Sequence, residues 1–161
     1  MDFYESDLED IIFHSLRTSG GVEKLKLLGL EIKDTPIRVF RQLRIGNYGI
    51  ADIVTVSKWY FSGIPKLLVT VYELKKNGID EKALIQAYRY VTGISHYLRN
   101  RGINNVIIEP VLIGRSVANS DWVYLMGNDP LCDVFTYEYK IDGMRFNQQP
   151  FSYNLVEPNF K

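Results

Sequence analysis

Cysteine and histidine are nearly absent from this sequence of 161 residues. It has one cysteine, Cys132, and two isolated histidines, His14 and His96. A single cysteine excludes an internal disulfide and a multi-cysteine zinc site, and it fits a reducing compartment. We therefore expect a cytoplasmic protein in which both histidines are structural or surface residues.

Long apolar runs and an excess of charge of either sign are also missing. No segment approaches the roughly 20 apolar residues that a membrane-spanning helix needs, and the acidic amino terminus does not resemble a signal peptide. Lysine plus arginine and aspartate plus glutamate both number 19, so the formal net charge is zero. We expect no membrane partner, and any nucleic acid must be bound by a local basic patch rather than by a global basic field.

The spacing of apolar residues predicts a mixed α/β fold in one domain, residues 1–161. Helices are expected at residues 5–16, 22–28 and 81–100. Strands are expected at residues 35–45, 51–60, 66–75, 105–114, 122–126, 134–140 and 144–147. The last three strands form a β extension, about residues 115–161, to a core at about residues 5–114.

Turns and helix ends predict the topology of that core. Tight turns, the second at Ser62-Gly63-Ile64-Pro65, join the first three strands into an antiparallel meander. A helix capped by Asp80 then crosses over to a strand that should pair in parallel. The expected core stripe of this helix is Leu84, Ala87, Val91, Ile94 and Leu98. The result is a mixed sheet flanked by helices.

An acid-x-lysine pattern at the end of an apolar strand is the most informative motif. Glu73 and Lys75 are two positions apart, so they project from one face of the strand. Asp52, at the start of the neighbouring strand, is expected to approach them on that face. Two carboxylates and a main-chain carbonyl suit Mg²⁺ or Mn²⁺, and a lysine can position water or offset negative charge. The alternative is an exposed ion pair on an edge strand.

The helix that follows carries Gln86 and Tyr90, which are four residues apart and share a face. Acid, acid-x-lysine and Q-x-x-x-Y therefore stand in order as Asp52, Glu73-Leu74-Lys75 and Gln86-Ala87-Tyr88-Arg89-Tyr90. With these residues the chain resembles the PD-(D/E)XK nuclease superfamily, and more closely its RecB-like and NucS/EndoMS-like branches. The resemblance covers about residues 5 to 114.

This resemblance implies a restriction-endonuclease-like core and a nuclease dependent on Mg²⁺ or Mn²⁺, with DNA favoured over RNA as the substrate. The implied catalytic residues are Asp52, Glu73 and Lys75. The implied metal ligands are Asp52, Glu73, the main-chain carbonyl of Leu74, and either Glu5 or Glu9 through water, of which the motif favours Glu5. The residues implied to contact substrate or brace the site are Gln86, Tyr90, Arg89, Gln42 and Arg44.

Other functions fit parts of the same pattern. A catalytically silent binding or assembly module could keep the nuclease fold, and a nuclease could instead act on RNA or branched DNA. Glu5 and Glu9 could be ordinary acids at a helix start, and Gln86 and Tyr90 could be a buried hydrogen-bonded pair. A neutral chain of this size could also need a homodimer or a partner protein to hold its substrate.

Two further groups of residues have an open role. The aromatic residues Trp59, Tyr60 and Phe61, near the tip of a long hairpin, could stack on bases, contact a second copy or simply pack. Basic residues could form a phosphate-binding patch or a scattered, solvated surface. They are Arg38, Arg41, Arg44, Lys58, Lys76, Lys82, Arg89, Arg99 and Arg101.

Overall fold

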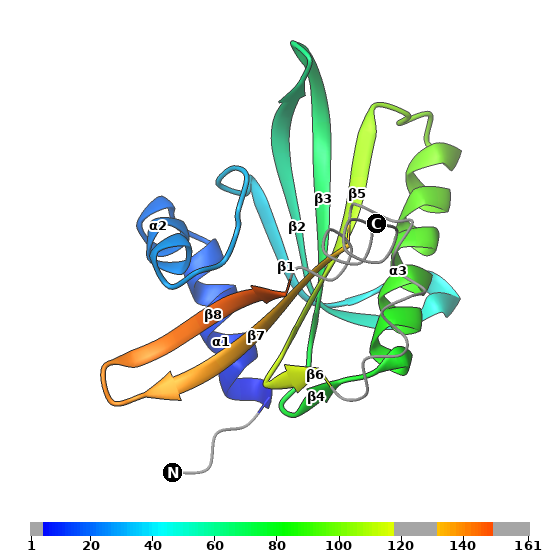
Figure 1. The fold of residues 1–161 in the computed structure, drawn as a ribbon. Helices are drawn as coiled ribbons and strands as arrows, with labels where there is room; N and C mark the ends of the chain where they lie inside the picture. Colours follow the sequence, from blue (N-terminus) through cyan, green and yellow to red (C-terminus); the bar gives the residue numbers. More distant parts are fainter. Residues whose placement is uncertain (1–4, 118–131, 150–161) are drawn as a thin grey trace, which may run out of the picture.

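The structure, a computed structural model, describes residues 5–117 and 132–149 (Figure 1). A six-stranded mixed sheet with the order β1-β2-β3-β5-β7-β8 forms its centre. Helices cover both faces of this sheet, so the predicted α/β class is confirmed (Figure 1). The helices are α1 (Glu5–Leu16), α2 (Ser19–Leu27) and α3 (Glu81–Asn100). The strands of the sheet are β1 (Arg38–Arg44), β2 (Ile50–Phe61), β3 (Ile64–Leu74), β5 (Val106–Gly114), β7 (Asp133–Lys140) and β8 (Gly143–Gln149).

The pairing of the strands follows the predicted meander and crossover. β1, β2 and β3 pair in antiparallel succession, and β5 pairs with β3 in parallel after α3. A second, two-stranded sheet pairs β4 (Gly78–Ile79) with β6 (Ser116–Val117), and a 3-10 turn, η1 (Gly46–Tyr48), joins β1 to β2. These three short elements were not predicted as such, because two or three residues carry no periodicity.

The helix α3 has the predicted bounds, and its cap is present. Asp80 Oδ1 accepts a hydrogen bond of 3.0 Å from the Ala83 amide, which satisfies a free donor of the first turn. The predicted core stripe was partly wrong. Val91 and Leu98 are only partly buried, while Tyr90 is buried instead. The buried face of α3 includes Tyr90 because η1 and Gly49 pack on this side of the helix. The helix alone would expose that face.

Two turn predictions also differ from the structure. The second helix begins at Ser19 rather than at Val22, because Thr18 Oγ1 accepts a hydrogen bond of 2.9 Å from the Gly21 amide and caps it. The β2–β3 turn is only Ser62-Gly63, both with positive φ, so Pro65 is already paired with Tyr60 in the hairpin. The Thr18 cap and the glycines beside it therefore start this helix earlier than the predicted position.

The carboxyl-terminal hairpin continues the main sheet. β7 pairs in parallel with β5, and β8 pairs antiparallel with β7. Phe135, Tyr137, Met144 and Phe146 belong to the same buried cluster as the apolar face of α1. The hairpin therefore completes the core rather than lying beside it. The strand predicted at residues 122–126, and the tyrosines Tyr124 and Tyr153, lie outside the described residues.

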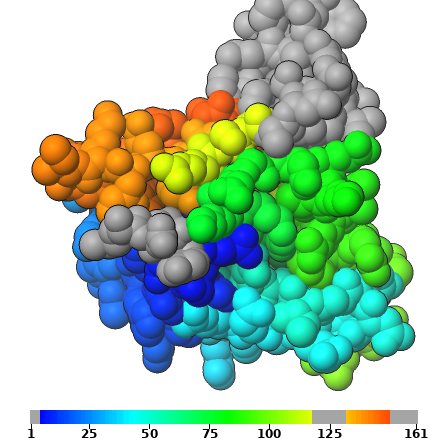
Figure 2. Space-filling model, turned by 90° about the horizontal axis from the view of Figure 1, so that it is seen from below, coloured from blue at the N-terminus to red at the C-terminus, as the bar shows by residue number. Residues whose placement is uncertain are grey.

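The apolar core lies on both faces of the sheet. One apolar cluster lies between the sheet and α1 with α2, and two smaller clusters lie under α3. At one edge of the molecule the start of α1 (blue) lies between the β1–η1 segment (cyan) and the segment leading into α3 (green) (Figure 2). None of the helices in the described ranges is long and apolar enough to cross a membrane.

The aromatic residues of the β2–β3 hairpin lie at the end of the sheet away from β4 and β6 (Figure 1). Trp59 and Phe61 contact each other with ring centroids 5.8 Å apart, and Lys33 Nζ lies 5.1 Å from the Trp59 ring centroid. Tyr60 remains 68% exposed. These residues are packed in part, and they pair with residues 64–66 of β3, at the opposite end of that strand from Glu73.

Candidate active site

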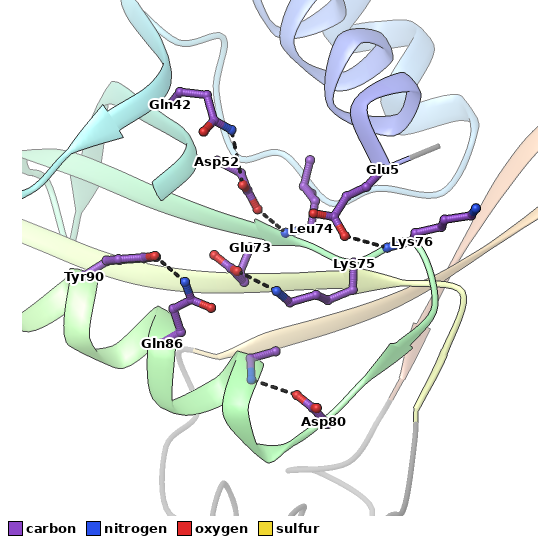
Figure 3. A network of polar contacts seen from close by, with 11 residues as sticks. Glu5, Gln42, Asp52, Glu73, Leu74, Lys75, Lys76, Asp80, Gln86 and Tyr90 are labelled. Atoms are coloured by element: carbon purple, nitrogen blue, oxygen red, sulfur yellow. Dashed lines mark hydrogen bonds and ion pairs between the residues drawn. The ribbon is translucent and has the colours of Figure 1, made fainter. Parts of the chain in front are cut away.

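The sheet opens between β2 and β3 where the predicted acids lie (Figure 3). Ile53 and Tyr72 are the last backbone-paired positions at this end of the two strands. Asp52 and Glu73 are the next positions in the register, so both side chains lie on the α3 face. In place of a strand partner, the Leu74 amide donates a hydrogen bond of 2.8 Å to Asp52 Oδ2. The Asp52 carboxylate is thereby fixed where the strands separate.

Glu73 and Lys75 form an ion pair that leaves one carboxylate oxygen unsatisfied. Lys75 Nζ lies 3.2 Å from Glu73 Oε1. The Glu73 side chain is 3% exposed, and its Oε2 atom is buried with no hydrogen-bond partner in the part of the chain that the structure describes. Such an oxygen is costly to bury, so it is well suited to accept a cation. An exposed edge-strand ion pair, the alternative reading of this motif, does not describe it.

The pKa values of these groups reflect their burial and mutual charge. Burial, and then the charge of Asp52, raises the pKa of Glu73 to about 7, although Lys75 acts against this shift. Burial also raises the pKa of Asp52, against the lowering effect of the Leu74 amide. Burial tends to lower the pKa of Lys75, but the charge of Glu73 and its hydrogen bond outweigh that tendency and raise it. The pKa values of both carboxylates are thus raised, while the neighbouring Lys75 stays protonated.

The Leu74 carbonyl lies on the Asp52 side of β3. The Lys75 amide donates a hydrogen bond of 2.8 Å to the Ile113 carbonyl in β5. A trans peptide directs its N–H and C=O to opposite sides, so the Leu74 carbonyl faces away from β5 and toward β2. The predicted main-chain ligand thus faces the gap between the two acids.

Both candidate acids of α1 reach this edge of the sheet, and each is held by a specific donor. Glu5 Oε2 accepts a hydrogen bond of 3.0 Å from the Lys76 amide, just beyond β3 (Figure 3). Glu9 is buried, and its Oε1 accepts a hydrogen bond of 2.7 Å from Gln42 Nε2 and lies 3.4 Å from Arg41 Nε. Neither is a plain helix-start acid without a tertiary contact.

The two acids of α1 differ in their electrostatic reach. The charge of Glu5 helps to raise the pKa of both Asp52 and Glu73. The charge of Glu9 acts in the same way on Asp52. Glu5 therefore acts on both of the carboxylates that line the opening between the strands.

Gln42 connects α1 to the site through a strained backbone. Its Nε2 atom also lies 3.4 Å from Asp52 Oδ1, so one amide group bridges Glu9 and Asp52. Its φ angle is +50°, which is uncommon for a residue other than glycine and costs about 1–3 kcal/mol. Residues held in this way concentrate at functional sites, and this one points its side chain at the acid cluster.

Gln86 and Tyr90 of α3 lie beside Glu73 of β3 (Figure 3). Gln86 Nε2 donates a hydrogen bond of 2.5 Å to Tyr90 Oη. Tyr90 is 1% exposed and packs on Gly49, where a Cβ would come within 3.0 Å of its ring. Burial raises the pKa of Tyr90, so its phenol stays neutral. Tyr90 braces the site, while the half-buried Gln86 also lines a neighbouring groove.

Arg44 and Arg89 do not join the carboxylate cluster. Both are exposed, and neither forms an ion pair within the described ranges. They line a groove that Gln86 and Tyr90 also border. The predicted site residues thus divide into a carboxylate–lysine cluster and a separate basic wall.

The donor set fits a hard divalent cation that retains water. Among residues 5–117 and 132–149, no three acid, histidine or cysteine side chains are arranged to hold a metal ion by themselves. Asp52, the unsatisfied Oε2 of Glu73 and the Leu74 carbonyl are oxygen donors at one opening. Mg²⁺ typically takes one or two protein carboxylates and several waters, so a ready-made protein cage is not required.

Two contacts of buried acids carried too weak a sequence signal to be predicted. The contact of Gln42 with Glu9 joins residues 33 positions apart, and nothing in either segment announces it. The burial of Glu109, whose Oε2 lies 2.6 Å from Lys33 Nζ on the opposite face of the sheet, was also missed. A lone acid inside the apolar run Val106–Gly114 could have indicated that second buried pair.

Comparisons with protein-family models, with curated proteins and with solved structures found no match to this chain. The geometry of the site is therefore the basis on which a function is inferred.

Proposed function

We propose that this chain is a metal-dependent nuclease with a restriction-endonuclease-like core, which hydrolyses phosphodiester bonds in DNA. The observation that carries the proposal is the buried, unsatisfied Oε2 of Glu73, which lies in a cluster with Asp52 and the cation of Lys75. A buried carboxylate oxygen without a hydrogen-bond partner does not stabilise a fold. The same oxygen can act as a ligand for the cation of a metal-dependent reaction.

Asp52, Glu73 and the Leu74 carbonyl would hold Mg²⁺ or Mn²⁺, and Glu5 would act through water. The cation would supply Lewis-acid charge and a water of lowered pKa. These residues keep their positions without the cation, because Asp52 is fixed by the Leu74 amide and Glu5 by the Lys76 amide. Preorganised ligands of this kind spare the reaction a reorganisation cost.

Lys75 provides the fixed positive charge of the reaction. Burial tends to lower its pKa, but the charge of Glu73 raises it above the ordinary value, so Lys75 is protonated at neutral pH. Its ammonium group donates hydrogen bonds to a non-bridging phosphate oxygen or to the attacking water. As water attacks phosphorus and the bond to the leaving oxygen breaks, charge grows on the phosphate oxygens, and a nearby cation stabilises it.

Cleavage of a labelled substrate panel tests this proposal. The panel contains unpaired, duplex and flapped DNA and unpaired RNA, each incubated with Mg²⁺, Mn²⁺ or EDTA. We expect cleavage of DNA that requires a metal, and a loss on the order of 10²-fold or more in Glu73→Gln and in Lys75→Met.

The chain contains its own matched control. Glu138 and Lys140 form a second acid-x-lysine pair on a strand, with Nζ and Oε1 3.4 Å apart and both side chains exposed. Glu138→Gln should cleave like the unchanged protein. No metal-dependent cleavage of any substrate, or equal activity in Glu73→Gln, would exclude the nuclease and favour a silent binding module.

A further inference from the structure

A groove runs beside the carboxylate cluster, between the β1–η1 segment and α3. Its volume is about 720 Å³, and its walls include Arg44, Ile50, Lys82, Ile85, Gln86 and Arg89. A neighbouring hollow of about 530 Å³ shares Tyr48, Ile85 and Arg89 with it. The cyan and green segments that form these walls adjoin on the face shown in Figure 2.

The groove is positively charged although the chain as a whole is neutral. Arg44, Lys82 and Arg89 are exposed and line it, and none of the described residues in its lining is acidic. None of the three forms an ion pair within residues 5–117 and 132–149. By contrast, Arg41, on the α1 side of the same strand, is paired with Glu9 and Asp10. The groove cations are therefore available to an anionic ligand.

The groove leads directly to the proposed reaction centre. Gln86 and Tyr90 line it, and both lie beside Glu73 in the close view of Figure 3. A chain of phosphates held by Arg44, Lys82 and Arg89 would therefore reach the opening between β2 and β3.

Apolar side chains line the groove together with the cations. Ile50 is 41% exposed and Ile85 is 52% exposed, and Tyr48 belongs to the same wall. Exposed apolar groups beside phosphate-binding cations are suited to unpaired bases, which stack and pack on apolar and aromatic surfaces. A duplex turns its bases inward, so it would contact the cations and leave this apolar wall unused.

We propose that this groove binds an unpaired nucleic-acid strand, with its phosphates on Arg44, Lys82 and Arg89 and its bases on Ile50, Ile85 and Tyr48. The groove feeds that strand to Asp52, Glu73 and Lys75. This inference rests on the proposed nuclease function and specifies the strandedness of its substrate.

Equilibrium binding of the full chain in EDTA tests the groove independently of cleavage. The probes are a fluorescein-labelled unpaired DNA of 20 nucleotides, the RNA of the same sequence and the corresponding duplex. We expect the unpaired strands to bind at least tenfold more tightly than the duplex. The variant R44Q/K82Q/R89Q should lose at least tenfold in affinity, and the slope of log K against log salt should fall by about 2, since each lost contact removes about 0.7.

Two further variants complete the test. K58Q/R99Q/R101Q removes the same charges at positions outside the groove and should bind like the unchanged chain. Ile50→Ser with Ile85→Ser should reduce the preference for the unpaired strand while leaving duplex binding unchanged. Thermal melting verifies that each variant is folded. We expect all of them to fold, because the substituted side chains are exposed.

The outcomes separate the groove from the nuclease. Binding through the groove without metal-dependent cleavage would uphold the groove and exclude the nuclease. Cleavage with full affinity in R44Q/K82Q/R89Q would exclude the groove and uphold the nuclease. Duplex binding equal to strand binding, or no binding of any probe, would overturn the groove. A preference for RNA would uphold it and move the proposed reaction to RNA.

Discussion

At the scale of single residues, the site combines charges that oppose folding. Glu73 is buried beside Asp52, and its pKa is raised to about 7 by burial and by that neighbouring carboxylate. Lys75 relieves only one of its oxygens. Such arrangements persist when a function requires them, because a neutral residue of the same shape would be more stable.

Glu73→Gln should therefore raise the stability of the protein in EDTA. The folded-state pKa exceeds the ordinary 4.5, so the folded state binds the extra proton, and the free energy of unfolding falls as pH rises from about 4.5 to 7. At pH 8 the full penalty is present, and we expect the variant to gain about 1–3 kcal/mol. At pH 4, below the ordinary pKa, the gain should nearly vanish. Urea denaturation at both pH values measures it.

The same experiment with added Mg²⁺ should reverse the order. A ligand that binds only the folded state stabilises it by an amount that grows with the logarithm of [ligand]/Kd, so the unchanged protein should gain stability and Glu73→Gln should gain little. Glu138→Gln, on an exposed pair, should respond to Mg²⁺ like the unchanged protein. Equal Mg²⁺ responses in all three proteins would contradict a metal site at Glu73.

A second acid cluster on the opposite face gives an independent pH test. Burial, and then the charges of Glu31 and Glu109, raises the pKa of Asp133 to about 6. This group therefore also destabilises the fold as pH rises from about 4 to 6. Asp133→Asn should be more stable at pH 7.5 by at most about 1 kcal/mol, because solvent screens this half-buried group. A lower melting temperature for Asp133→Asn than for the unchanged protein at pH 7.5 would contradict this prediction.

The sequence predicted some of these residues and missed others for physical reasons. Asp52, Glu73 and Lys75 could be related because strand period and meander register place them on one face. The bridging role of Gln42 depends on a positive φ and on a contact with α1, and neither leaves a pattern in the sequence. Local periodicity predicts which face a residue occupies, but not which distant side chain meets it.

At the scale of elements, the junction of η1 with α3 shapes the groove. Gly93 lies under this junction, and a Cβ there would come within 2.6 Å of Tyr48 Cδ2 and 2.7 Å of Ile45 Cγ2. Gly93 is therefore the residue that lets η1 pack closely on the helix. The helix itself was predictable from its length, its apolar spacing and its Asp80 cap, whereas this close approach was not.

Gly93→Ala should destabilise the protein by about 1–3 kcal/mol, because the added methyl group overpacks the junction. Gly20→Ala is the control, since a Cβ at Gly20 meets nothing within 4 Å and alanine favours a helix. That control should be neutral or slightly stabilising. Urea denaturation of both variants measures the difference, and an equal effect of the two substitutions would show that η1 does not pack tightly.

At the scale of the whole molecule, the carboxyl-terminal hairpin is part of the core. Phe135 is 1% exposed and lies in the cluster that α1 also enters. The sequence predicted the two strands of the hairpin, residues 134–140 and 144–147, but not the parallel pairing of β7 with β5. That pairing depends on packing across the whole sheet, for which short-range sequence patterns hold no information.

Phe135→Ala should cost about 3–5 kcal/mol, because it removes a large buried side chain and leaves a cavity. Ile141→Ala, at the fully exposed tip of the same hairpin, should change the free energy of unfolding by less than about 0.5 kcal/mol. Chemical denaturation monitored by tryptophan fluorescence measures both. A small cost for Phe135→Ala would mean that the hairpin is an independent appendage.

The segment that follows β3 is held from both ends of the chain. Its Lys76 amide donates to Glu5 in α1, and its Lys76 carbonyl accepts a hydrogen bond of 2.7 Å from Tyr137 Oη in β7. These partners are 71 and 61 residues away in sequence. Contacts of such separation close large loops and form late in folding. During synthesis the segment beside Glu73 would thus lack its contact with Tyr137 until β7 has left the ribosome, so a chain cut short before β7 would hold that segment from α1 alone.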